Sequence, residues 1–125
     1  MRVPGFLARQ ILVPGSFRAT ADGFTIAARN PFGDGWLTGI GRIAVDGRPV
    51  DPAAVTATRS GDAAVYRADG VTPQTPVAFR KGDEVIFIVR GPVPGPGEHT
   101  LEVEIAERNL GLLVVEVREP LVPPA

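Results

Sequence analysis

The sequence predicts an all-β fold: a single antiparallel β-sandwich, jelly-roll-like, with at most one short helical turn. Glycine stands beside aspartate at short intervals, in ADG (21–23), VDGRP (45–49), RSGDA (59–63), ADG (68–70) and KGDE (81–84). Such pairs favour tight hairpin turns, which need a positive φ. Runs of β-type sequence lie between these turns, and no amphipathic helix of ordinary length is visible, which is typical of a sandwich or barrel.

The predicted strands follow one another along the whole chain. They cover residues 9–13, 16–20, 23–28, 37–45, 55–60, 64–68, 75–80, 84–90, 99–107 and 110–117. One helical turn is expected at DPAAV (51–55), where Asp51 can cap it and Pro52 suits the first helical position. The 125 residues form one domain, 1–125, and the ends, about 1–8 and 118–125, are expected to be loose.

Side-chain alternation predicts which faces are buried. In HTLEVEIAE, apolar residues alternate with polar ones, as in a sheet with one face in a core and one in water. EVIFIVR and LGLLVVEV break this rule, because they carry a second apolar face, formed by Ile86, Ile88, Leu112 and Val114. Burial of each such side chain stabilises a protein by roughly 1.5–3 kcal/mol, so we expect another chain segment or another subunit to cover this second apolar face. A partner subunit is favoured, and the chain's own tail EPLVPPA is the alternative.

Composition excludes several classes of function. The net charge is −1 and no basic run is present, so a nucleic-acid partner is not expected. No apolar run approaches the ~20 residues of a membrane helix, and no signal peptide is visible, so we expect no membrane partner. The absence of cysteine rules out disulfides and fits a reducing compartment. We therefore expect a cytoplasmic protein.

Catalytic motifs are sparse. His99 is the single histidine, which excludes a zinc site of the Cys/His type, and neither Ser16 nor Ser60 lies in a G-x-S-x-G elbow. Glu102 and Glu104 share a strand face, which is typical of a solvated surface. His99 follows the loop GPVPGPG (91–97), where it is either a half-buried rim residue bonded to that loop or a titrating group aimed at a ligand. No residue of this chain is assigned a catalytic or metal-binding role.

The aromatic loop, RNPFGDGWLTG (29–39), contains Phe32 and the single tryptophan, Trp36. These aromatics can plug the open end of the sandwich, anchor a partner, or form a platform for a sugar ring. A sugar site pairs aromatics with several polar groups, and only Asn30 and Asp34 are near. The plug and the anchor are therefore preferred to the sugar platform.

Short motifs in this order resemble the small, or beta, subunits of bacterial C-glycoside deglycosidases. The similarity lies in GSFR, in the strand that leads to NPF, in VDGRPV followed by PAAV, and in PGPGEH before an alternating strand. It spans roughly residues 10–106 and places His99 in the family's PG-x-H turn.

The resemblance implies a heteromeric lyase that releases the aglycone from 3-oxo-glucosyl C-glycosides, with O-glycosides as a further substrate class. A (β/α)₈-barrel alpha subunit would carry the catalytic base and a divalent metal, Mn²⁺ or Mg²⁺, while this chain would hold no cofactor. Phe32, Asp34 and Trp36, with the second apolar face, would contact the partner or line the rim of the site, and His99 would have a minor role. The alternative from another class is a stand-alone carbohydrate-binding or protein-interaction module.

Overall fold

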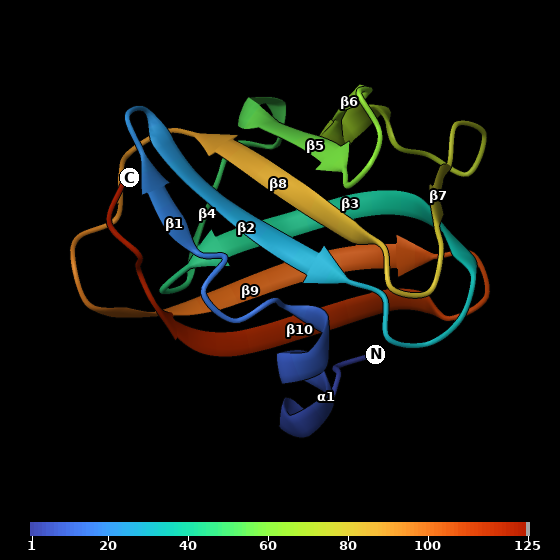
Figure 1. Cartoon of the computed structure of the whole chain (residues 1–125), viewed down its shortest axis with the longest axis horizontal. Coiled ribbons are helices and arrows are strands. Elements are labelled where there is room, and N and C mark those ends of the chain that lie inside the picture. Colours follow the sequence, from blue (N-terminus) through green and yellow to red (C-terminus); the bar gives the residue numbers. More distant parts are fainter. Residues whose placement is uncertain (125) are drawn as a thin grey trace.

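Two antiparallel sheets packed face to face make up the protein in the computed structural model, which describes residues 1–124 (Figure 1). The first sheet has the order β1 (Arg18–Thr20), β2 (Gly23–Arg29), β8 (Glu84–Arg90), β5 (Val55–Arg59), β6 (Val65–Arg67). The second has the order β10 (Gly111–Pro120), β9 (Glu98–Glu107), β3 (Gly35–Val45), β4 (Arg48–Pro49), and β7 (Val77–Phe79) pairs with β3. The predicted all-β sandwich is confirmed.

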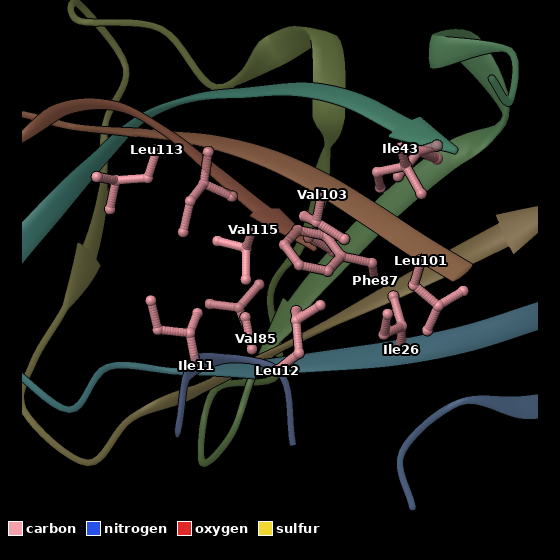
Figure 2. Packing of buried hydrophobic residues seen from close by; sticks show 14 of the residues in the cluster. Ile11, Leu12, Ile26, Ile43, Val85, Phe87, Leu101, Val103, Leu113 and Val115 are labelled. Atoms are coloured by element: carbon pink, nitrogen blue, oxygen red, sulfur yellow. The ribbon is translucent and has the colours of Figure 1, made fainter. Parts of the chain in front are cut away.

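The core lies between the sheets, and along β8, β9 and β10 it is built by regular alternation. In β8, Val85, Phe87 and Val89 are buried while Ile86 and Ile88 are only half-buried. The inward-facing residues of β9 and β10 meet them from the other sheet (Figure 2). Phe87 is completely buried near the middle of this layer. The alternation that was read from the sequence therefore decides which side of each strand faces the core.

The hairpin between β3 and β4 has the predicted Asp-Gly turn. Asp46 has φ 52° and Gly47 has φ 80°, and Val45 pairs with Arg48 across the turn. Two consecutive residues in the left-handed conformation give a turn whose twist matches that of the flanking strands. Asparagine, aspartate and glycine tolerate this conformation best. The second ADG sequence instead forms a 3₁₀ turn, η2 (Ala68–Gly70), between β6 and β7.

Helical structure is more extensive than the single predicted turn. That turn is present as η1 (Pro52–Ala54), where the Asp51 side chain accepts a hydrogen bond from the Ala53 backbone at 3.0 Å. Residues 9–13, predicted as a strand, lie mainly in a helix, α1 (Gly5–Ile11), which buries Ala8 and Ile11. A helix of two turns is too short for its periodicity to stand out from a β pattern. None of the helices in residues 1–124 has the length and apolar character needed to cross a membrane.

Helix α1 closes one side of the sandwich, and the segments around it join the two sheets. Before the helix, the Val3 backbone donates to the Val114 carbonyl of β10 at 2.9 Å. After the helix, the Val13 backbone donates to the Ala27 carbonyl of β2, also at 2.9 Å. The chain therefore passes from β10, at the edge of the second sheet, to β2 of the first sheet, and α1 packs against both strands (Figure 1).

Backbone pairing orders both ends within residues 1–124, which differs from the loose ends expected at residues 1–8 and 118–125; residue 125 lies outside the described residues. Strand β10 continues to Pro120, and beyond it the Val122 backbone donates to the Phe17 carbonyl at 2.8 Å. The Ala19 backbone donates in turn to the Val122 carbonyl. Both ends lie along sheet edges, where unpaired backbone groups can accept another strand.

The position of Phe87 predicts the largest single loss of stability. Phe87→Ala should lower the free energy of unfolding by about 3–5 kcal/mol, because the truncated side chain leaves a cavity between two rigid sheets. Urea unfolding followed by circular dichroism measures the loss. Ile88→Ala, one residue away on the outer face, is the control and should cost clearly less; equal losses would contradict the assignment of faces.

Candidate functional site

The second apolar face predicted from the sequence is divided between opposite sides of the protein. Ile86 and Ile88 lie on the outer face of the first sheet, where threonine and alanine of β2 and β5 are their cross-strand neighbours. Leu112 and Val114 lie on the outer face of the second sheet, and Leu112 is 49 % exposed. The four residues therefore form no common surface. Contact of either pair with a partner stays a prediction.

One end of the sandwich is organised by Asn30, a buried residue of the aromatic loop. Its side-chain amide donates to the carbonyls of Gly33 and Phe79, both at 2.7 Å. Its side-chain oxygen accepts a hydrogen bond from the Phe32 backbone at 2.9 Å. These bonds fix the loop against β7 and hold the Phe32 ring outward, with 43 % of the residue exposed.

Glu107 joins the aromatic loop to the turn between β9 and β10. Its carboxylate accepts hydrogen bonds from the backbones of Trp36, Asn109 and Leu110, at 2.7–3.0 Å. Burial opposes ionisation of this carboxyl, but the backbone donors outweigh it and lower the pKa of Glu107 below its ordinary value. Gly35 makes room for the carboxylate, since a Cβ at that position would lie 2.6 Å from Glu107 Oε2.

Trp36 and Asp34 of the aromatic loop are also held in place. The guanidinium of Arg108 lies 5.2 Å from the centre of the Trp36 ring, as in a cation–π contact. The Asp34 carboxylate accepts a hydrogen bond from the Lys81 backbone at 3.1 Å. Trp36 is 42 % exposed, so the aromatics do not form a buried plug. Beside Phe32 a small hollow of about 180 Å³ reaches Leu110 and Leu113.

The opposite end of the sandwich holds a larger cleft, the His99 cleft, of about 620 Å³. It opens between the β3–β4 hairpin, η1 and the loop of residues 91–97. This loop lies at the left of the view in Figure 1. Its walls include Phe24, Val45 and Val89, and Arg48, Arg90 and His99 also line it.

His99 connects three segments at this cleft. Its Nδ1 lies 2.6 Å from an oxygen of the Asp46 carboxylate, and its Nε2 lies 2.6 Å from the Gly95 carbonyl. The hydrogen bond to the 91–97 loop, which was one of the two alternatives for this residue, is present. The ring also packs edge-on against Phe17, with 5.8 Å between ring centres. We call the unit formed by Asp46, Gly95 and His99 the imidazole clasp.

The imidazole clasp favours the charged form of histidine, because both ring nitrogens face acceptors and only imidazolium can donate from both. The Asp46 carboxylate, followed by the Gly95 carbonyl, raises the pKa of His99 above its ordinary value. The hydrogen bonds from His99 and from the Thr100 backbone lower the pKa of Asp46. The pairing with the Asp46 carboxylate thus favours imidazolium over the neutral ring.

Sequence reasoning identified His99 but not the residues that meet it. Asp46 was recognised only as a turn residue, and Arg48 and Arg90 were given no role. Asp46 and His99 are 53 positions apart, so their contact depends on how β3 pairs with β9. Within residues 1–124, histidine and acidic side chains do not gather in groups of three or more that could hold a metal ion.

Residues 7–122 match the protein family described as hydroxymethylglutaryl-CoA reductase, N-terminal domain. No curated protein matches the chain. The family match overturns the resemblance to the beta subunits of C-glycoside deglycosidases, and the inferred role as a subunit of an aglycone-releasing lyase was wrong. The motifs behind that inference lie at turns and strand starts, such as Asp46-Gly47 and the loop before His99, where backbone geometry alone favours glycine, proline and aspartate.

The expectations that came with that resemblance lose their basis. The barrel-type alpha subunit and its Mn²⁺ or Mg²⁺ were implied by it alone, and no observation tests them. The roles of Phe32, Asp34, Trp36 and His99 toward a partner or substrate likewise stay predictions.

Substitution of Gly35 tests the close approach of Glu107. Gly35→Ala should lower the free energy of unfolding by about 1–3 kcal/mol, because the new methyl group displaces a buried carboxylate from its backbone donors. The measurement is urea unfolding, with Trp36 fluorescence as the local probe. Gly33→Ala is the matched control, since a Cβ there meets nothing within 4 Å. A loss at position 33 equal to that at position 35 would contradict this account.

The imidazole clasp predicts a pH-dependent contribution of His99 to stability. The pKa of His99 is raised from 6.5, so this contribution is complete below that value and is lost as the pH rises through the raised pKa. The pKa of Asp46 is lowered from 3.8, so its contribution is complete above that value and is lost as the pH falls through the lowered pKa. Both contributions are complete between these two values.

His99→Gln should therefore destabilise the protein more at about pH 6 than at about pH 9. Urea unfolding of both proteins at the two pH values measures the difference. The imidazole resonance of the wild type reports the pKa without ambiguity, since the chain has one histidine. A pKa at or below the ordinary value, or an equal cost at both pH values, would show that the clasp does not depend on imidazolium.

Proposed function

The chain belongs to the family of hydroxymethylglutaryl-CoA reductase N-terminal domains, and we propose that it is a non-catalytic domain that acts with the catalytic part of such a reductase. The catalytic part can belong to the same polypeptide or to a separate one. In this proposal the sandwich docks on the catalytic part, and hydride transfer takes place there. The cytoplasmic location stays a prediction.

The observation that carries the proposal is the imidazole clasp. Reduction of a thioester carbonyl develops negative charge on its oxygen, which an enzyme stabilises with a donor or protonates with an acid. Histidine is the side chain used most often for such proton transfer. In this chain both nitrogens of His99 are directed at fixed acceptors within the protein, 2.6 Å away. Because both nitrogens are occupied by partners within the chain, His99 is placed to hold the loop of residues 91–97 and not to transfer a proton to a substrate.

The other titratable groups with shifted pKa values also serve local structure. Hydrogen bonds from the Ala64 backbone and the Tyr66 hydroxyl lower the pKa of Asp62, and the bond to Asp62 raises the pKa of Tyr66. Glu107 receives backbone donors from two loops. Shifted pKa values mark functional sites when they occur together in a cleft, and structural networks produce them as well. These groups are dispersed over separate turns, which supports the structural interpretation.

The end of the sandwich that carries the aromatic loop is the docking surface we propose. Phe32, Trp36 and Leu110 each expose more than 40 % of their surface there. Phe32 and Leu110 line the small hollow. Exposed aromatic side chains that are held rigidly are the usual anchors of protein interfaces, since little conformational freedom is lost on binding. The contact between Arg108 and the Trp36 ring leaves less of that ring free for a sugar, so the sugar-platform alternative has no support from this geometry.

The proposal is tested with the full chain and the catalytic part of the reductase from the same source. By itself the chain should not reduce hydroxymethylglutaryl-CoA, and it should bind the catalytic part in a calorimetric titration. Phe32→Ser together with Leu110→Ser should weaken that binding by about tenfold or more, as expected when anchor residues are lost. Val65→Ser is the control, because Val65 is 64 % exposed on a different strand. Turnover by the chain alone, or failure to bind the catalytic part, would refute the proposal.

A further inference from the structure

The His99 cleft has the size and the walls of a small-molecule site. Its volume of about 620 Å³ falls within the range of ~300–1,000 Å³ that is typical of ligand pockets. Phe24 and Val89, which are almost fully buried, line it together with Val93, which is 46 % exposed. A ligand in this cleft would therefore meet a mainly apolar wall.

Two arginines line the cleft from opposite sheets. Arg48 belongs to β4 of the second sheet, and Arg90 ends β8 of the first. Within residues 1–124, neither has an acidic group within 4.0 Å, in contrast to the arginines that form ion pairs, namely Arg2, Arg29, Arg42, Arg59, Arg67 and Arg118. Both guanidinium groups thus keep their hydrogen-bond donors available to a ligand.

The other charged groups of the cleft already have partners within the protein. The positive charge of His99 is matched by Asp46, which lies 2.6 Å away. The Asp51 carboxylate accepts the capping hydrogen bond of η1 from Ala53. With histidine protonated, three positive groups (Arg48, Arg90, His99) face two negative ones (Asp46, Asp51), and the cleft has an excess of positive charge.

We infer that the His99 cleft binds a small molecule with an apolar body and one anionic group. The apolar body would lie against Phe24 and Val89, and the anionic group would accept hydrogen bonds from Arg48 and Arg90. Guanidinium is suited to this role, since its planar donors match the oxygens of carboxylate, sulfonate and phosphate groups. The inference goes beyond the proposed function and holds whether or not the chain acts with a reductase.

The imidazole clasp gives this site a fixed wall. The loop of residues 91–97 lines the cleft and has no helix or strand within it, so its position depends on a few contacts. The bond from His99 to Gly95 joins its middle to β9, and the Leu121 backbone donates to the Gly97 carbonyl at 3.0 Å. A wall that is fixed before binding reduces the entropy lost when a ligand enters.

The fluorescent probe 1-anilinonaphthalene-8-sulfonate tests the inference, since it joins an apolar aromatic body to one sulfonate. We expect saturable binding to the folded chain at about pH 6, where the clasp is complete. Arg48→Gln with Arg90→Gln should weaken binding by about tenfold, as expected for the loss of charge-assisted hydrogen bonds. Arg9→Gln with Arg80→Gln makes the same change of charge at exposed sites outside the cleft, and should leave binding within about twofold.

Two further measurements separate anion recognition from unspecific adsorption. N-phenyl-1-naphthylamine has the same aromatic body without the sulfonate, and its binding should be equal in the wild type and in both double variants. Amide shifts in a nuclear magnetic resonance titration with the sulfonate probe should concentrate at Gly91, Gly95 and His99. Absence of binding to the folded wild type, equal weakening by both double variants, or shifts at the aromatic loop would overturn the inference.

Discussion

The pleat of a β-strand sends alternate side chains to opposite faces, and this period of two decides which residues of the protein can share a core. In β8 the period places Val85, Phe87 and Val89 between the sheets, and in β9 it does the same for every second residue from Leu101. A shift of one residue in the pairing of these strands would exchange a buried phenylalanine for a half-buried isoleucine. Keeping the same side chains in the core fixes the register of the strands. The register in turn fixes where the turns lie and which loops meet at the two open ends of the sandwich.

Polar side chains that act as hydrogen-bond centres hold the two open ends. Asn30 and Glu107 organise one end, and Asp46 organises the other. Each of the three bonds to backbone groups that are distant in the sequence, and each is placed at a turn or strand end where those groups lack partners within a sheet. Loops without regular structure thereby become rigid, and rigid loops leave hollows of definite shape. The exposed aromatics and the His99 cleft are both consequences of this arrangement.

The sequence could predict what depends on local order. Alternation in HTLEVEIAE, the Asp46-Gly47 turn and the cap formed by Asp51 are each contained in a few neighbouring residues, and the structure has all three. It could not predict that Ile86 and Leu112 lie on opposite sides of the molecule, because that depends on which sheet each strand joins. The contact of Asp46 with His99, and the presence of Arg48 and Arg90 in one cleft, depend on the same information. The family was misjudged for a related reason, since turn residues reflect backbone geometry that unrelated β-proteins share.

The pairing of residues 1–3 with β10 has a consequence for how the protein is made. The Met1 nitrogen donates to the Leu112 carbonyl at 2.7 Å, across a separation of 111 residues. On a ribosome, residues 1–3 and α1 are synthesised well before β10. Their contacts with β10 therefore cannot form until nearly the whole domain has emerged. Contacts between residues far apart in sequence slow folding, because a long loop must close before they can form. Closure of the sandwich by α1 is therefore expected to be a late event in the folding of the domain, and a chain interrupted before residue 111 would leave the apolar side of that helix uncovered.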